Sequence, residues 1–147
     1  MGAAQTIAAL LATACSSLFA GAAVYITLVE HPARMECGRE VAATEFPPSY
    51  RRGAMMQAPL AILGFLFSVA AWAQGASPWW PVGGALLLAV VPFTLVVIMP
   101  VNRRLLDPML DKQSAEAAHL LSRWGQLHAV RSVLSVLALF VLLSARL

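Results

Sequence analysis

Trp124, His128 and Arg131 follow one another at intervals of four and three residues near the start of the last apolar segment. On a helix this spacing places all three side chains on one face. A histidine can take up a proton near neutral pH or bind a metal, and an arginine carries a permanent positive charge. Because ionisable groups are costly inside a membrane and usually face protein or water there, this face predicts a functional site.

Further polar residues stand at the matching ends of the other apolar segments. His31 follows the first segment, Gln57 lies near the start of the second, and Asn102 and Arg103 follow the third. When consecutive helices run antiparallel, these positions all fall at one membrane level. We therefore predict that they form one polar pocket together with the face of the last segment.

Four of these residues also have a structural explanation, which the sequence leaves open. Arg103 fits an anchor whose charge reaches the lipid headgroups, and Asn102 fits a cap on the carbonyl groups of its helix. Arg131 fits an ion pair with Glu30 that would hold the first and last helices together. His31 fits an interfacial position hydrogen-bonded to water.

The composition is that of a membrane protein. Of the 147 residues, 60% are hydrophobic and 12% are charged, and the mean hydropathy is +0.75. A soluble domain is about half apolar and about a quarter charged. The net charge is +3, but the basic residues flank apolar segments and do not alternate with aromatic residues, which excludes a nucleic-acid-binding surface.

Four apolar segments are long enough to cross a membrane, which needs about 20 residues. They span residues 3–29, 53–73, 82–99 and 125–145. In a membrane, helices must satisfy their own backbone groups and cover one another's polar side chains. The sequence therefore predicts a single domain over residues 1–147, with an all-α fold: an integral membrane antiparallel four-helix bundle.

Local features add detail to this bundle. Residues 35–46 and 108–121, in the two long polar connections, are expected to form short interfacial helices. Pro59 and Pro92 are expected to kink their helices. Two pairs of small residues one turn apart are expected to permit close helix contacts. These pairs are Ser17 with Gly21, and Gly64 with Ser68.

Lysine and arginine are distributed unevenly between the two sides of the predicted bundle. The two long connections carry Arg34, Arg39, Arg51, Arg52, Arg103, Arg104, Lys112 and Arg123. The opposite side, which holds both termini, carries only Arg146. The positive-inside rule then places the long connections in the cytoplasm and both termini outside it, and we expect a bacterial inner membrane.

Three stretches of the chain resemble a known family. They are residues 20–32, residues 99–105 with their Met-Pro-x-Asn motif, and residues 123–131 with a Trp-x-x-x-His-x-x-Arg motif. In order and spacing they resemble the anthrone oxygenase-like family of small integral membrane proteins, also called domain of unknown function 1772. The resemblance covers essentially the whole chain and implies a four-helix membrane fold. Characterised members oxidise polyketide anthrones to anthraquinones with O₂ and no known cofactor.

This resemblance implies catalytic roles for four residues. An anthrone has an acidic C–H bond beside a carbonyl-bearing ring system, so a base can remove that proton and leave an enolate that reacts with O₂. His128 or His31 would be the base, and Arg131 and Asn102 would stabilise the enolate oxygen. The expected activity is therefore that of an oxidoreductase, an anthrone oxygenase-like monooxygenase.

The same resemblance implies how a substrate would bind. Trp124 would stack on a flat, lipophilic aromatic molecule, and Gln57 and Arg103 would add polar contacts. Such a molecule would enter from the bilayer. The expected partners are therefore the lipid bilayer and a lipophilic aromatic small molecule, and association of several copies into a homo-oligomer stays open.

Two other classes of function stay open as well. His31 and His128 lie on different helices at one level, and they are candidate ligands for a haem or, with Glu30 or a methionine, for copper. The chain would then be a haem- or copper-binding membrane protein. The last class is a non-catalytic membrane subunit or ligand binder.

Overall fold

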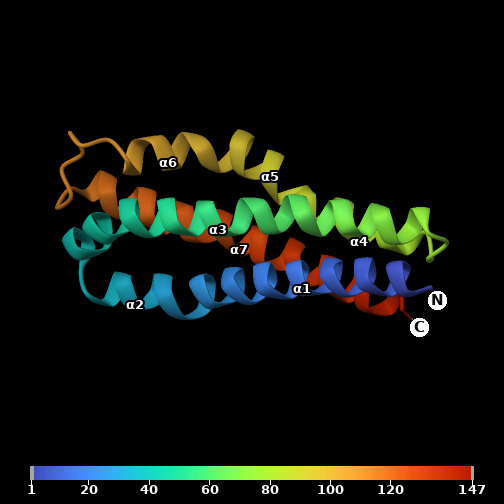
Figure 1. Cartoon of the computed structure of the whole chain (residues 1–147). Helices are drawn as coiled ribbons and strands as arrows, with labels where there is room; N and C mark the ends of the chain where they lie inside the picture. Colours follow the sequence, from blue (N-terminus) through green and yellow to red (C-terminus); the bar gives the residue numbers. More distant parts are fainter. Residues whose placement is uncertain (1, 147) are drawn as a thin grey trace.

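Four antiparallel helical rods build the molecule, as the computed structural model shows for residues 2–146 (Figure 1). The rods span Ala3–Glu36, Arg39–Ala73, Trp79–Leu105 and Ala115–Ser144, and each is long and apolar enough to cross a membrane. Within residues 2–146 there is no β-strand. The prediction of an all-α, four-helix membrane bundle is confirmed.

Two of the rods are continuous α-helices, and two are interrupted by π-helical turns. The second rod is α3 (Arg39–Ala73) and the fourth is α7 (Ala115–Ser144). The first rod consists of α1 (Ala3–Tyr25), η1 (Ile26–Glu30) and α2 (His31–Glu36). The third consists of α4 (Trp79–Leu88), α5 (Val90–Phe93), η2 (Thr94–Ile98) and α6 (Met99–Leu105).

Each π-helical turn comes directly before a residue that precedes a proline. The N–H group of His31 bonds to the carbonyl of Ile26 at the end of η1, and His31 is followed by Pro32. Met99 bonds to Thr94 at the end of η2 and is followed by Pro100. A proline has no N–H group to donate to the preceding turn, and a π turn rotates the following side chains relative to a regular helix.

The rods pack in a ring in which α3 and α7 lie on one diagonal. The helix α1 packs against α3 and α7, and α4 packs against the same two helices. Small residues permit this close packing. A Cβ atom added at Gly64 would lie 2.6 Å from the Cδ2 atom of Leu87. Gly64 and Ser68 are both buried, as predicted, whereas Ser17 and Gly21 are exposed, so the prediction for that pair is wrong.

The third rod separates from α3 beyond Leu88. The helix α3 packs closely along α4 but makes few contacts with α5 and α6. The break lies at Ala89, between α4 and α5, and Pro92 follows within one turn. The kink predicted at Pro92 is therefore present, whereas α3 continues through Pro59 without a break.

The rods extend beyond the predicted apolar segments. Residues 39–52 are the first turns of α3, and residues 115–124 are the first turns of α7, so the separate interfacial helices expected at 35–46 and 108–121 do not form. Gly38, with φ of 92°, allows the sharp turn into α3. Ser114 caps α7 by accepting a 3.1 Å hydrogen bond from the N–H group of Ala117. Both termini lie at the end of the bundle that also holds the turn between α3 and α4 (Figure 1).

Candidate functional site

A cavity of about 160 Å³ lies inside the bundle, in the half that carries the long connections. Its wall is mostly apolar and comes from all four rods. The polar and ionisable side chains in the wall are Arg34, Ser49, Tyr50, Gln57, Thr94, His128 and Arg131. The cavity is thus lined by all three residues of the α7 face, of which His128 and Arg131 are ionisable.

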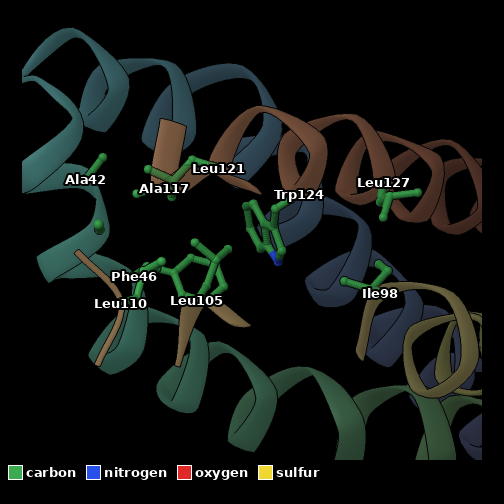
Figure 2. Close-up of a cluster of buried hydrophobic side chains, with 10 residues drawn as sticks. Ala42, Phe46, Ile98, Leu105, Leu110, Ala117, Leu121, Trp124 and Leu127 are labelled. Carbon is green, nitrogen blue, oxygen red and sulfur yellow. The ribbon is translucent and has the colours of Figure 1, made fainter. Parts of the chain in front are cut away.

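Trp124 is the large aromatic side chain at the centre of this half of the bundle. It lines the cavity and is 6% exposed. Figure 2 shows its indole extending from α7 into the cluster that contains Phe46, Ile98 and Leu105. The ring of His128 stacks on it at 4.7 Å between centroids, and Phe46 meets it edge-on at 5.2 Å. Its orientation is therefore fixed by packing on several sides.

Asn102 and His31 hold Trp124 from outside the cavity. The indole Nε1–H donates a 3.0 Å hydrogen bond to Oδ1 of Asn102, which is fully buried. The His31 ring lies 5.2 Å from the indole. A Cβ atom at Gly125 would lie 2.5 Å from Nε2 of His31, so a larger residue at that position would displace the His31 ring. Neither His31 nor Asn102 lines the cavity, although both contact Trp124, which does.

His128 presents one ring nitrogen to the protein and the other to the cavity. The side chain is 1% exposed, and its Nδ1 atom lies 3.0 Å from the hydroxyl oxygen of Thr27. That hydroxyl lies 2.7 Å from the hydroxyl of Ser132. Among residues 2–146 the Nε2 atom has no hydrogen-bond partner, yet it is not among the fully occluded polar atoms. Because His128 lines the cavity, Nε2 is the atom that a ligand there would meet.

Arg131 enters the same cavity without a carboxylate partner. Its Nη2 group donates a 2.7 Å hydrogen bond to Oε1 of Gln57, and its Cζ atom lies 5.7 Å from the centroid of the Phe19 ring. No Asp or Glu of the described residues lies within ion-pair distance of it. The alternative of an ion pair with Glu30 is not what the structure shows, because Glu30 pairs with Arg34. The cavity therefore contains an uncompensated positive charge.

The family model described as anthrone oxygenase matches residues 46–141. The chain belongs to the anthrone oxygenase family. The matched region runs from α3 into α7, so it contains Gln57, Asn102, Trp124, His128 and Arg131. No curated protein and no solved structure matches the chain. The family inferred from the sequence is thus confirmed over residues 46–141, a range that leaves out the first of the three stretches, residues 20–32. The chain is an integral membrane protein of the anthrone oxygenase family.

Arg34 is a cavity residue of this anthrone oxygenase family member that the sequence did not single out. It is 6% exposed, it pairs with Glu30, and its Nε atom lies 3.0 Å from Oε2 of Glu45. Its Nη2 group also donates a 3.2 Å hydrogen bond to Ser49, and its Cζ atom lies 5.8 Å from the Trp124 ring centroid. The spacing of four between Glu30 and Arg34 was the available signal for this pair.

Of the two other residues predicted to bind a substrate, one lies in the cavity and one on the surface. Gln57 is buried and lines the cavity, whereas Arg103 is exposed and lies outside it. Tyr50, whose ring stacks on Phe46 at 5.8 Å, lines the cavity but was not predicted. Thr27 was not predicted either, because a threonine within an apolar run carries no charge to mark it.

Few side chains that could bind a metal lie close together in this protein. Within residues 2–146, no group of three His, Cys, Asp or Glu side chains is arranged to hold one metal ion. Both candidate ligands, His31 and His128, pack their rings against Trp124.

Proposed function

We propose that this protein oxidises a flat, lipophilic aromatic substrate of the anthrone type with O₂. The observation that carries the proposal is the pairing of two groups in one apolar cavity: a histidine nitrogen without a protein partner and an arginine without a carboxylate. His128 would remove a proton from carbon, and Arg131 would stabilise the negative charge that develops on oxygen. Membership of the anthrone oxygenase family supports the same reaction.

The size and position of the cavity suit such a substrate. A volume of about 160 Å³ is close to that of an engineered cavity that binds benzene, about 150 Å³. It would therefore enclose the reacting part of a larger fused-ring molecule. Ala54, Ala58 and Leu95 line the cavity and are exposed on the outer surface of α3 and η2. Because this surface faces lipid, the substrate would enter from the bilayer and the rest of it would lie between these helices.

The chemistry balances without any further reactant. The Nε2 atom of His128 takes a proton from the methylene carbon, and the carbonyl oxygen of the anthrone becomes an enolate oxygen beside Arg131. The enolate transfers one electron to O₂, and the substrate radical and superoxide combine to form a peroxide at that carbon. The imidazolium of His128 returns its proton to the peroxide. Loss of the second C–H proton and cleavage of the O–O bond then give the quinone carbonyl and water.

The cavity wall would stabilise the enolate and superoxide more strongly than water does. Hydrogen-bond donors and fixed charges act more strongly where water is excluded, because they need not reorganise. The positive charge of Arg131 lies where both the enolate and the superoxide form. Trp124 presents an aromatic surface to the substrate, and its position is fixed by Asn102 and His31.

Oxygen consumption by the purified protein tests this proposal. The protein in lipid nanodiscs is mixed with an anthrone, and O₂ uptake and quinone absorbance are followed against empty nanodiscs, which report spontaneous oxidation. We expect one O₂ consumed for each quinone formed, without hydrogen peroxide, at a rate well above that of empty nanodiscs. The variant Ala58→Trp, which fills the opening toward lipid, should slow the reaction. A rate equal to that of empty nanodiscs would leave the protein as a non-catalytic binder.

The orientation in the membrane is a second proposal. We infer that the end with the long connections, and with it the cavity, faces the cytoplasm of a bacterial inner membrane, because the lysine and arginine residues concentrate there. Both termini would then be extracytoplasmic. A fluorescent protein that folds only in the cytoplasm, fused after Leu147, should stay dark, and a bright fusion would reverse the orientation.

A further inference from the structure

A chain of three hydrogen bonds connects the His128 ring to the backbone of α1. The Nδ1 atom of His128 lies 3.0 Å from Oγ1 of Thr27, and this oxygen lies 2.7 Å from Oγ of Ser132. The Ser132 hydroxyl lies 2.9 Å from the carbonyl oxygen of Ala23. Each of the three bonds crosses between α7 and the first rod, so the chain joins the two helices beside the cavity.

The direction of these bonds follows from their last member. A carbonyl oxygen only accepts hydrogen bonds, so the Ser132 hydroxyl donates its proton to Ala23. The Ser132 oxygen then accepts the proton of the Thr27 hydroxyl. The Thr27 oxygen, whose own proton is used, accepts from the Nδ1–H group of His128. This arrangement satisfies every polar group in the chain and requires the proton of neutral His128 to reside on Nδ1.

We propose that Thr27 is a positioning residue that keeps His128 in the tautomer with a proton on Nδ1 and a lone pair on Nε2, the atom facing the cavity. The partner of one ring nitrogen decides which nitrogen of a histidine is protonated. Free histidine in water favours the opposite tautomer, with the proton on Nε2, and such a ring could not act as a base in the cavity. The catalytic consequence rests on the proposed function, but the tautomer itself does not.

The local fold explains how Thr27 reaches His128. Thr27 lies within η1, the π-helical turn that ends where His31 bonds back to Ile26. A π turn holds an extra residue and changes which side chains face a neighbouring helix, and such turns are frequent at functional sites. On the other side, Ser132 lies one turn after His128 on α7, so the two partners of Thr27 belong to one face. Trp124 stacks on the ring and fixes its plane.

Nitrogen NMR of the full chain in nanodiscs, labelled with ¹⁵N-histidine, tests the tautomer directly. Coupling of the ring protons to each nitrogen distinguishes a protonated nitrogen from one with a lone pair, and the signal that is lost in His128→Gln assigns His128. We expect Nδ1 to be protonated and Nε2 to be free in the wild-type protein. In Thr27→Val, which keeps the shape but removes the hydroxyl, the population protonated on Nε2 should rise.

The matched variants separate this role from general packing. Thr27→Ser retains the hydroxyl and should restore the wild-type spectrum. Thr13→Val, whose hydroxyl bonds only to Ala9 of its own helix at 2.8 Å, should leave the His128 signals unchanged. With an anthrone as substrate, Thr27→Val should lower kcat by about 10²-fold, within the range that a positioned base contributes, with little effect on KM.

Two results would overturn the proposal: a wild-type His128 with a proton on Nε2, or a Thr27→Val spectrum identical to that of the wild type. If the spectra agree with expectation but no anthrone is oxidised, the proposed function fails while the positioning role stands. If oxidation occurs and the spectra do not change, the positioning role alone is wrong.

Discussion

His128→Ala should lower the turnover of an anthrone by about 10²–10⁴-fold, the range that general acid–base catalysis contributes. The variant removes the Nε2 atom that faces the cavity, and no other side chain in the wall offers a neutral imidazole. His31 cannot substitute for it, because its ring packs behind Trp124 and does not line the cavity. Quinone formation and O₂ uptake in nanodiscs give the measurement.

The bundle should remain folded in this variant. An internal polar contact in a membrane protein contributes about 0.6 kcal/mol on average, so losing the bond to Thr27 costs little. Thermal unfolding in detergent checks this point. His119→Ala is the matched control, since His119 is exposed near the start of the same helix, and it should retain full activity. Near-normal turnover in His128→Ala would show that His128 is not the base.

The face of α7 could be predicted from the sequence because charge in an apolar run is a strong signal. Histidine and arginine are rarely placed inside a membrane segment without a structural or functional reason. The regular spacing of Trp124, His128 and Arg131 then needs only helical geometry to bring them together. The cavity contains all three, together with Gln57 from α3.

The roles of His31 and Asn102 could not be separated from those of the cavity residues by sequence alone. Membrane level is readable from position in a helix, but the direction of a side chain depends on how the helices rotate. The π-helical turns η1 and η2 precede His31 and Asn102 and change that rotation. Both side chains consequently meet Trp124 instead of the cavity.

Arg34 could not be predicted as a cavity residue for a different reason. In the sequence it is one of several arginines outside the apolar segments, and such residues normally act as topology signals at the membrane edge. Its burial depends on Glu45 and Ser49, which approach only because α3 begins at Arg39 and packs against α2. Hydropathy outlines the lipid-facing part of a helix, whereas backbone hydrogen bonding continues beyond it, so this extension of α3 was not predictable.

The faces of α1 show a further limit of the sequence. Ser17 and Gly21 are a valid small-residue pair, but the buried face of α1 carries Ser16 and Ala20, each one position earlier. A helix that is apolar all round gives little indication of which face meets protein. Gly64 and Ser68 were assigned to the correct face of α3, where Leu87 and Cys15 approach Gly64 closely.

Substitution of the two cavity arginines should affect different properties: turnover for Arg131 and stability for Arg34. Arg131→Met should lower turnover by about 10²–10³-fold, as the loss of one donor to a developing oxyanion does. Its effect on stability should be small, because the hydrogen bond to Gln57 is worth about 0.6 kcal/mol on the average for membrane proteins. Arg34→Met instead leaves two carboxylates, Glu30 and Glu45, without their cation.

Breaking a buried ion pair by removing one partner costs about 3–5 kcal/mol in soluble proteins. Since Glu30 and Glu45 retain 28% and 41% side-chain exposure, we expect Arg34→Met to lose about 3 kcal/mol, at the low end of that range. Unfolding in detergent and quinone formation, measured on both variants, separate the two effects. A stable, inactive Arg131→Met beside an unstable Arg34→Met would support an oxyanion role for Arg131. If Arg131→Met unfolds as readily as Arg34→Met, the uncompensated charge in the cavity serves the architecture of the bundle and not its chemistry.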